Sequence, residues 1–519
     1  MAITSPTMPQ LRSPLKPEPT APAASLSRFD PIFRLAICIV LYAIPAVVVT
    51  RAVTDWDIWW HLRTGQWVLE HHAVTTTDPF SSYGEDKSWA AYSWLFEVLV
   101  YGLYQWFGLY GVILYRAVMS FAIVASLHRL VAKREPRFLP ATLLTGLGVV
   151  ALIPLMNERP WLFTILFTTW TVDAILDLRA GTAKRWVWLL PLVFAVWANV
   201  HIQFIYGLIL LVAACAAPVA DRYLNRSALR EAFSPNGTDA GRLGSPAWWK
   251  LVALTAACGA ATLLNPYHAQ LYAIVLEYAT RPGPYQVVIE LTALDFRAPW
   301  DWAGIVLAFA AVFALGRRAK LSTFDVLLLA AGVFLAFRAR RDLWFMVVVA
   351  SAILATSSHA AARPEELFPL TRLRLRLVAA AVVLVMIFTA CVRNLTPSGL
   401  QDHVEKMFPV RAVAFVKEQG YGGPLYNHFN WGGYLIWALP DLPVAIDGRT
   451  NLHGDERILR FENTWKGMKG WETDADLADA NVIIAYANAP LGLTSLLYRD
   501  SRFELVYEDE VAVVFVRKK

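Results

Sequence analysis

The stretch "DWDIWWHLRTGQWVLEHH", from Asp55 to His72, directly follows the first long apolar run of the chain. It holds an acid pair, four tryptophans, and a histidine four residues after the second acid. If the stretch is helical, Asp57 and His61 lie on the same face. Acids and indoles next to an apolar run predict an ordered loop at the point where the chain leaves a membrane.

The composition supports a membrane protein. The chain has 519 residues, of which 57% are hydrophobic and 17% charged, and its mean hydropathy is +0.43. These values are too apolar for an ordinary soluble domain. The net charge of +6 comes from short basic clusters between apolar runs, which are typical of topology signals. We therefore expect a polytopic protein that contacts membrane lipids and binds no nucleic acid.

Apolar runs of bilayer length predict about eleven membrane crossings. They lie near residues 33–50, 111–130, 140–156, 162–178, 186–200, 203–220, 249–264, 302–316, 323–337, 343–357 and 377–392. The stretch from Trp94 to Phe107 is also apolar, but it contains Glu97 and Gln105. We expect this stretch to form a helix at the membrane interface.

With this assignment, the basic clusters between crossings fall on one side of the membrane, together with the N-terminus. The positive-inside rule makes that side cytoplasmic. If residues 94–107 crossed the membrane, every later cluster would change sides. The opposite face, periplasmic in the inner membrane of the expected bacterial host, receives the first loop, the tail, and the loops "NERP" (157–160), "WANVH" (197–201), "NPYH" (265–268) and "RARRD" (338–342).

The sequence divides into three regions. Residues 1–28 are rich in Pro, Ala, Ser and Thr and are predicted to be a disordered cytoplasmic segment. Residues 29–392 form the predicted transmembrane domain, with a large first outer loop at 51–110. Residues 393–519 are predicted to form a periplasmic α/β domain, in which helices near 410–419 and 490–499 alternate with strands in "GPLYNHF", "YLIWAL", "PVAID", "NVIIAYA" and "FELVYEDEVAVVFVRK". The expected fold class is thus an α-helical polytopic membrane protein with a C-terminal soluble α/β domain.

Asp55 and Asp57 are the candidate catalytic residues. A carboxylate at this position can accept a proton from an attacking hydroxyl, and two together can bind a divalent cation such as Mg²⁺ or Mn²⁺. The alternative is a plain solvated helix end. The length of the loop favours the functional interpretation, because long ordered loops in compact proteins tend to be functional.

Further candidates for substrate binding lie at the outer ends of the apolar runs. Trp59 and Trp60 adjoin the acids and can stack on a sugar, although indoles also favour the headgroup region for their own sake. The remaining candidates are His61, Trp94, Glu97, Arg159, His201 and His268. For the histidines, structural hydrogen bonding is the alternative. Glu158 is expected to form a structural ion pair with Arg159.

The "RARRD" motif places Arg338, Arg340 and Arg341 at an outer helix end, against the charge rule that the other clusters obey. The guanidinium group presents a planar fork of donors that matches phosphate oxygens. We therefore predict that these arginines bind a lipid phosphate or pyrophosphate. The alternative is that they extend to phospholipid headgroups.

The order of these parts resembles the start of the C-class membrane glycosyltransferases. The parts are a first crossing, the acid pair, the helix "WWHLRTGQWVLE", an aromatic loop, the interface helix "SWLFEVLVYGLYQWFG" and "LYRAVMSF". This class includes protein mannosyltransferases and lipid A aminoarabinose transferases, which take sugar from a polyprenyl-phosphate carrier. The chain is also similar to bacterial membrane proteins with "WWHL..G", "RP.LFT", "WANVH" and "NPY" signatures.

The resemblance implies a C-class fold and an acid of the first outer loop that acts as base or metal ligand, here Asp55 or Asp57. A "PDE" acid motif is replaced by "DWD" in this chain, which leaves the choice of base open. The resemblance implies a hexosyl or pentosyl transferase that moves sugar from a polyprenyl-phosphate carrier to a glycan, lipid or protein acceptor. Two alternatives are a transporter or flippase for a lipid-linked glycan and a non-catalytic partner in cell-envelope assembly.

Overall fold

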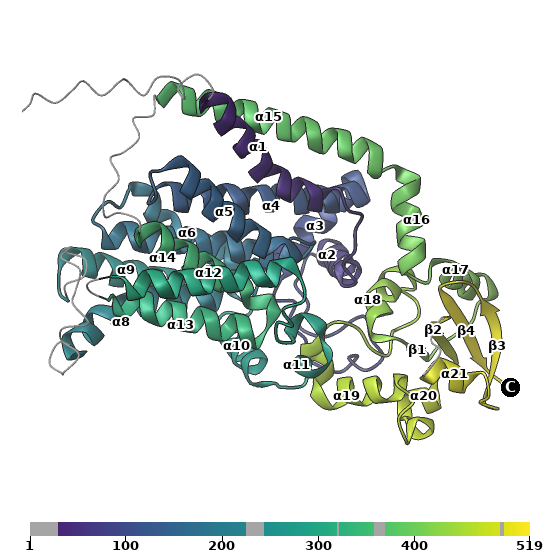
Figure 1. Cartoon of the computed structure of the whole chain (residues 1–519). Coiled ribbons are helices and arrows are strands. Elements are labelled where there is room, and N and C mark those ends of the chain that lie inside the picture. Colours follow the sequence, from purple (N-terminus) through teal and green to yellow (C-terminus); the bar gives the residue numbers. More distant parts are fainter. Residues whose placement is uncertain (1–29, 225–242, 319–320, 358–368, 488–491, 519) are drawn as a thin grey trace, which may run out of the picture.

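The structure is a computed structural model, which describes residues 30–224, 243–318, 321–357, 369–487 and 492–518. The segment 1–28, predicted to be disordered, lies outside these residues. Figure 1 shows a bundle of long helices with the tail packed at one end of it. The α1 and α15 helices lie together along one side of the bundle.

Each apolar run predicted to cross the membrane coincides with a helix. These helices are α1 (Asp30–Val49), α4 (Leu109–Ala132), α5 (Phe138–Leu152), α6 (Trp161–Arg179), α7 (Leu190–Val200), α8 (Phe204–Leu224), α9 (Pro246–Ala261), α12 (Pro299–Gly316), α13 (Thr323–Arg338), α14 (Leu343–Ser357) and α15 (Pro369–Asn394).

Five stretches of the described chain are helical, long and apolar enough to cross a membrane: Leu109–Ala132, Phe138–Leu155, Trp161–Arg179, Phe204–Tyr223 and Pro299–Gly316. Shorter apolar helices cover Arg34–Ala46, Arg185–Val200 and Leu377–Thr389. The protein is therefore a multi-pass membrane protein, and the number of eleven crossings stays a prediction.

The first outer loop contains two helices, α2 (Ile58–His71) and α3 (Trp94–Phe107). The helix predicted over 94–107 therefore has the expected bounds. The two helices pack closely because Gly65 has no side chain: a Cβ at this position would lie 2.1 Å from the carbonyl oxygen of Glu97. This contact brings the residues that follow the acid pair next to α3.

A second outer segment follows α9. It contains α10 (Gln270–Thr280), α11 (Pro284–Val287) and the short 3-10 helix η5 (Ile289–Leu291), and it returns to α12. The α11 helix contacts α19 of the tail. The 3-10 helix η6 (Arg340–Asp342) joins α13 to α14 and contacts η5. Polar residues of these connections therefore lie close to the tail.

The tail begins with α16 (Pro397–Met407) and α17 (Val410–Gln419) and contains a four-stranded sheet in the order β1-β2-β4-β3. The strands are β1 (Leu425–Asn427), β2 (Val482–Tyr486), β3 (Phe503–Glu508) and β4 (Ala512–Arg517). β1 pairs with β2 in parallel, and the other pairs are antiparallel. The remaining helices are α18 (Phe429–Ala438), α19 (Thr450–Trp465), α20 (Ala475–Asp479) and α21 (Leu493–Leu497).

Two of the predicted strands are wrong. "YLIWAL" belongs to the helix α18, and "PVAID" contributes only an isolated bridge between Val444 and Ser81. A short apolar run does not distinguish a buried strand from a buried helix. Here Gly432 and Gly433 permit close packing, because a Cβ at Gly432 would meet the carbonyl oxygen of Ile446 and one at Gly433 the backbone of Trp56.

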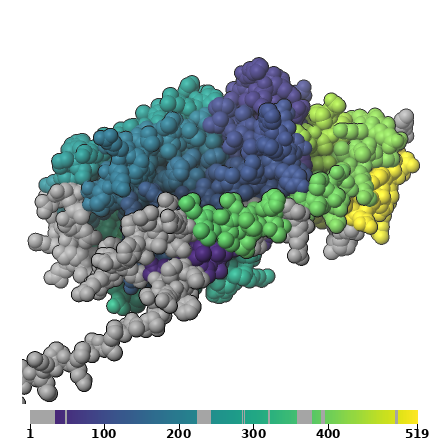
Figure 2. All heavy atoms as spheres, turned by 90° about the horizontal axis from the view of Figure 1, so that it is seen from above, coloured from purple at the N-terminus to yellow at the C-terminus, as the bar shows by residue number. Residues whose placement is uncertain are grey.

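The tail packs directly against the first outer loop. α18 contacts α2, and the bridge between Ser81 and Val444 joins the loop to the tail by its backbone. In Figure 2 the green and yellow tail abuts the purple and blue part of the molecule. The candidate site lies in a cavity between these parts.

Candidate active site

A cavity of about 720 Å³ lies between the outer loops of the membrane region and the tail. Its walls come from the first outer loop, from the loops that precede α6 and α8, from the segment between α10 and η5, from η6 and from the tail. Several of the predicted site residues line it: Asp57, Trp60, His61, Glu97, Arg159, His201 and Arg341. Positions far apart in the sequence are thus brought to one cavity.

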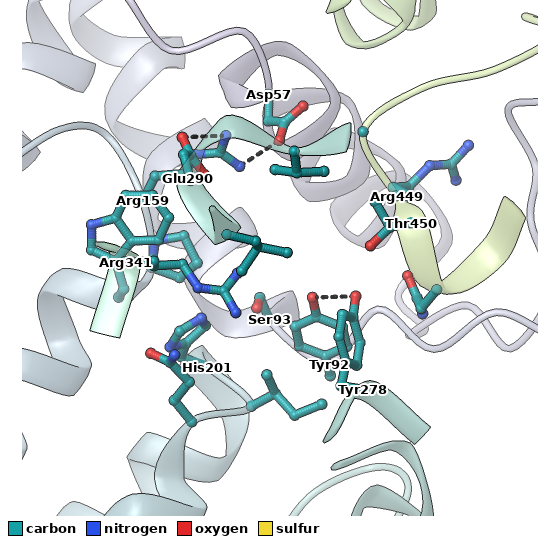
Figure 3. A pocket seen from close by; sticks show the side chains of 18 of the residues that line it. Asp57, Tyr92, Ser93, Arg159, His201, Tyr278, Glu290, Arg341, Arg449 and Thr450 are labelled. Atoms are coloured by element: carbon teal, nitrogen blue, oxygen red, sulfur yellow. Dashed lines mark hydrogen bonds and ion pairs between the residues drawn. The ribbon is translucent and has the colours of Figure 1, made fainter. Parts of the chain in front are cut away.

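The acid pair is organised by Arg159. Its Nε lies 2.5 Å from an oxygen of Asp55, and its Nη1 lies 2.5 Å from an oxygen of Asp57. Its Nη2 lies 3.5 Å from an oxygen of Glu290, which lies in η5. Figure 3 shows the contacts of Arg159 with Asp57 and Glu290 on one wall of the cavity. A single guanidinium therefore faces three acidic side chains.

The two aspartates differ in exposure. Asp55 has a side chain that is 1% exposed and does not line the cavity, whereas that of Asp57 is 18% exposed and does. Burial raises the pKa of Asp55 to about 8, although Arg159 opposes the shift. Asp57 is thus the acid of this pair that faces the cavity, and Asp55 is buried behind it.

His61 and Glu97 form a buried pair at the cavity wall. His61 Nδ1 lies 3.1 Å from a carboxyl oxygen of Glu97, and the two side chains are 3% and 1% exposed. Burial raises the pKa of Glu97 well above its ordinary value and lowers that of His61 well below its own. The second oxygen of Glu97 has no hydrogen-bond partner among the described residues. It is available to a polar group of a ligand.

The three arginines of "RARRD" point to different places. Arg341 lines the cavity and has no hydrogen bond or ion pair to any residue that the structure describes; in Figure 3 it extends toward the middle of the cavity. Arg338 stacks over Tyr285 at 4.5 Å, and Arg340 pairs with Asp295 at 3.4 Å outside the cavity. Asp342 accepts hydrogen bonds from Gln203 and Tyr206 instead of pairing with an arginine.

Three other predicted residues lie away from the cavity. Trp59 is buried against Phe408 and Tyr434. Trp94 donates its indole N–H to Asn199 at 2.8 Å, and His268 contacts the carbonyl oxygen of Leu263; both line a separate shallow hollow. His201, which does line the main cavity, also bonds to Thr164 at 2.8 Å.

Glu158 does not pair with Arg159, contrary to the expectation from sequence. It pairs with Arg116 of α4, and both side chains are buried. Arg116 also donates to the carbonyl oxygens of Arg51 and Ala52, just before the acid pair. The side chains of the neighbours Glu158 and Arg159 point in different directions, so they have different partners. Arg116 therefore connects the loop that carries Asp55 with the one that carries Arg159.

The tail contributes a wall that sequence reasoning missed. Arg449 lines the cavity and pairs with Asp78 of the first outer loop at 2.5 Å and with Asp447 at 2.7 Å. Burial raises the pKa of Asp447, but Arg449 and His453 outweigh it and lower this pKa overall. Thr450, beside this cluster, also faces the cavity, as Figure 3 shows.

Tyr92 and Tyr278 were also missed. Their hydroxyls lie 3.0 Å apart at the cavity wall, where they join the first outer loop to α10 (Figure 3). Glu290 and Gly448 complete the set, and a Cβ at Gly448 would meet the Asp57 carboxylate at 2.0 Å. No local motif marks these positions, since they are defined by contacts between distant segments.

Both of the predicted metal ligands are engaged by an arginine. Across the described ranges, no group of three or more His, Cys, Asp or Glu side chains is arranged to hold a metal ion. Both predicted ligands, Asp55 and Asp57, direct an oxygen at Arg159.

The fold was compared with those of solved structures. An oligosaccharyltransferase from Archaeoglobus fulgidus, tethered with an acceptor peptide containing the NVT sequon, matches 95% of this chain and 75% of its own length, with a TM-score of 0.50 and 10% identity. The fold is similar to that of C-class membrane glycosyltransferases. The C-class fold expected from the sequence is therefore confirmed, and an identity this low supports the fold alone.

Two further solved structures have lower scores. ArnT from Cupriavidus metallidurans bound to undecaprenyl phosphate covers 93% of this chain and 97% of its own, with a TM-score of 0.48 and 10% identity. The mycobacterial arabinofuranosyltransferase AftD covers 95% of this chain and 42% of its own, with a TM-score of 0.45 and 14% identity. No protein-family profile and no curated protein matches the sequence.

Proposed function

We propose that the protein is a glycosyltransferase that moves a hexosyl or pentosyl group from a polyprenyl-phosphate carrier to an acceptor on the periplasmic face of a bacterial inner membrane. The N-terminus is then cytoplasmic and the tail periplasmic. The observation that carries this proposal is one cavity that holds both a carboxylate, Asp57, and an arginine, Arg341, that makes no hydrogen bond or ion pair with the described residues. These are the two groups that transfer from a phosphate donor requires.

The chemistry follows from these two groups. Asp57 accepts the proton of the acceptor hydroxyl as its oxygen bonds to the anomeric carbon of the sugar. The bond from that carbon to the phosphate oxygen breaks, and the carrier phosphate leaves with the bonding electrons. Arg341 stabilises the charge that develops on this leaving group. Proton, sugar and phosphate are all accounted for, and no other reactant is needed.

The lining of the cavity includes groups that suit both substrates. Val275, Val288, Ile289 and Leu291 are apolar side chains that suit an isoprenoid chain. The tail contributes His428, Asn430, Asn451 and Glu462, which suit a polar acceptor such as a glycan or another hydroxyl-bearing molecule.

The first test measures the thermal stabilisation of the detergent-purified protein by undecaprenyl phosphate. A ligand at a hundred times its Kd stabilises a protein by about 2.7 kcal/mol. We expect this shift in the wild type and in Arg340→Ala, whose side chain pairs with Asp295 outside the cavity. We expect it to disappear in Arg341→Ala.

The second test separates catalysis from binding. Asp57→Asn should keep the lipid-dependent stabilisation but lose roughly a hundredfold or more of transferase turnover with a polyprenyl-phosphate sugar. A flippase would retain its transport in this variant, and an assembly partner would show neither turnover nor stabilisation in the wild type. No shift in the wild type at saturating lipid would contradict the proposed donor.

A further inference from the structure

The acidic side chains around Arg159 are arranged as in a cation-binding site, but the cation at their centre is the Arg159 guanidinium. Asp55 and Asp57 come from the first outer loop and Glu290 from η5, yet all three converge on one guanidinium. Nε, Nη1 and Nη2 each face a different carboxylate. Two or three carboxylates from separate segments are also the ligands that Mg²⁺ and Mn²⁺ prefer.

A divalent ion does not fit while Arg159 is there. One oxygen of Asp55 accepts from Arg159 Nε and from Asn157, and its other oxygen accepts the backbone N–H of Asp57 at 2.8 Å. One oxygen of Asp57 is taken by Arg159 Nη1. Magnesium needs ligand oxygens about 2.1 Å away in near-octahedral geometry, and the guanidinium already fills the space between these oxygens. The site excludes a divalent ion because these carboxyl oxygens already accept hydrogen bonds from the protein.

Arg159 is held in place from its own side. Its carbonyl oxygen accepts a hydrogen bond from Tyr115 at 2.8 Å, and its guanidinium lies 5.3 Å from the ring of Trp161. The preceding residue, Glu158, is buried and paired with Arg116. The backbone at this point is therefore fixed between α4 and α6, and the guanidinium cannot leave the carboxylates without breaking several contacts.

We propose that Arg159 is a built-in replacement for a divalent cation, which holds Asp55, Asp57 and Glu290 together so that Asp57 faces the acceptor without a metal. Arg159 is a positioning residue in this account, since it acts through Asp57. The catalytic role of Arg159 rests on the proposed function. The prediction that the intact cluster binds no metal does not depend on that function.

The test is a Mn²⁺ titration followed by electron paramagnetic resonance and by thermal stability, which needs neither donor nor acceptor. Wild-type protein should bind no Mn²⁺ at the cavity. Arg159→Ala removes the internal cation and leaves the three acidic side chains, so it should gain a Mn²⁺ site that the wild type lacks. Adding Asp57→Asn to Arg159→Ala should abolish this gain.

Arg341→Ala is the matched control, because it removes a cavity arginine that touches none of the three carboxylates; it should gain no Mn²⁺ binding. Arg159→Gln, which keeps most of the side-chain volume, replaces Arg159→Ala if the latter does not fold. Wild-type Mn²⁺ binding that Asp57→Asn removes would overturn the proposal, as would folded Arg159 variants that gain none. A transferase assay that fails while these metal results hold would count against the proposed function alone.

Discussion

Two arginines that line one cavity make similar ion pairs in different surroundings. Arg159 faces Asp55, Asp57 and Glu290, and the exposed fractions of its own side chain and of the latter two range from 14% to 37%. Arg449 faces Asp78 and Asp447, and none of these side chains is more than 1% exposed. The first cluster is open to a ligand, whereas the second is closed.

Exposure distinguishes a candidate functional ion pair from a structural ion pair when the residue types are the same. A buried pair contributes mainly through what happens when it is broken, because the remaining charge is left without a partner. Arg449 therefore joins the tail to the first outer loop, and Arg159 presents Asp57 to the cavity.

Arg449→Ala should have the largest effect on stability. It leaves Asp78 and Asp447 buried without their cation, a change that typically costs about 3–5 kcal/mol. Denaturant unfolding of the purified protein measures the loss, and limited proteolysis should cut the tail first. Arg411→Ala in the same tail, whose side chain is 72% exposed, should cost no more than about 1 kcal/mol. Equal losses in the two variants would erase the distinction between the clusters.

Gly448→Ala connects the two walls. Its new Cβ would lie 2.0 Å from an oxygen of Asp57, so either the tail or the carboxylate must move. Overpacking of this kind costs about 1–3 kcal/mol, and we expect it to lower transferase turnover roughly tenfold or more. Gly422→Ala, where a Cβ meets nothing within 4 Å, is the control and should leave turnover unchanged. Normal turnover in Gly448→Ala would mean that the Asp57 position is not critical.

The pH dependence of unfolding should have opposite signs in the two clusters. Burial raises the pKa of Asp55 from 3.8 to about 8, so the folded state keeps a proton that the unfolded chain loses, and the contribution of Asp55 to stability falls as the pH rises through this window. The pKa of Asp447 is lowered below 3.8, so its contribution is present above that pH and is lost in more acidic solution.

Unfolding measured across the acid and neutral range tests both signs. Asp55→Asn should flatten the decline toward pH 8 and leave the acid limb intact, whereas Asp447→Asn should do the reverse. A single variant that flattened both limbs would show that the two clusters titrate as one unit.

Glu290→Gln should have the smallest effect. The contact of Glu290 with Arg159 is 3.5 Å long and its side chain is 37% exposed, so water screens it. Loss of such a pair typically changes stability by less than about 1 kcal/mol. Thermal unfolding should therefore rank Asp55→Asn above Glu290→Gln, and the opposite order would mean that Glu290 is the main partner of Arg159.

Local patterns were enough to predict much of this structure. The helix over 94–107, the helix over 410–419 and the strands β1 and β2 were predicted from apolar periodicity and turn residues alone, and β3 and β4 lie within one predicted β run. Asp57, His61 and Arg341 were singled out by their unusual positions, and all three line the cavity. Helices, strands and residues of unusual type at the end of an apolar run are determined by neighbours within a few positions. A short window of sequence is therefore enough to predict them.

Contacts between distant segments were not predictable in the same way. Asp78 and Arg449 are separated by 371 positions in the sequence, and nothing near either residue marks the other as its partner. The pairing of Glu158 with Arg116, and not with its neighbour Arg159, depends on how α4 packs beside α6. The helix α18 was mistaken for a strand because its short apolar run fits both, and only its docking on α2 distinguishes them.

The separation of Asp78 from Arg449 also has a consequence for biosynthesis. A ribosome makes the loop with the acid pair well before the tail, so the nascent chain carries Asp57 for some time without the wall that Gly448 and Arg449 provide. The cavity is closed only when the tail docks on the first outer loop. The complete cavity therefore forms only after the tail has docked, and a chain released before Arg449 lacks that wall.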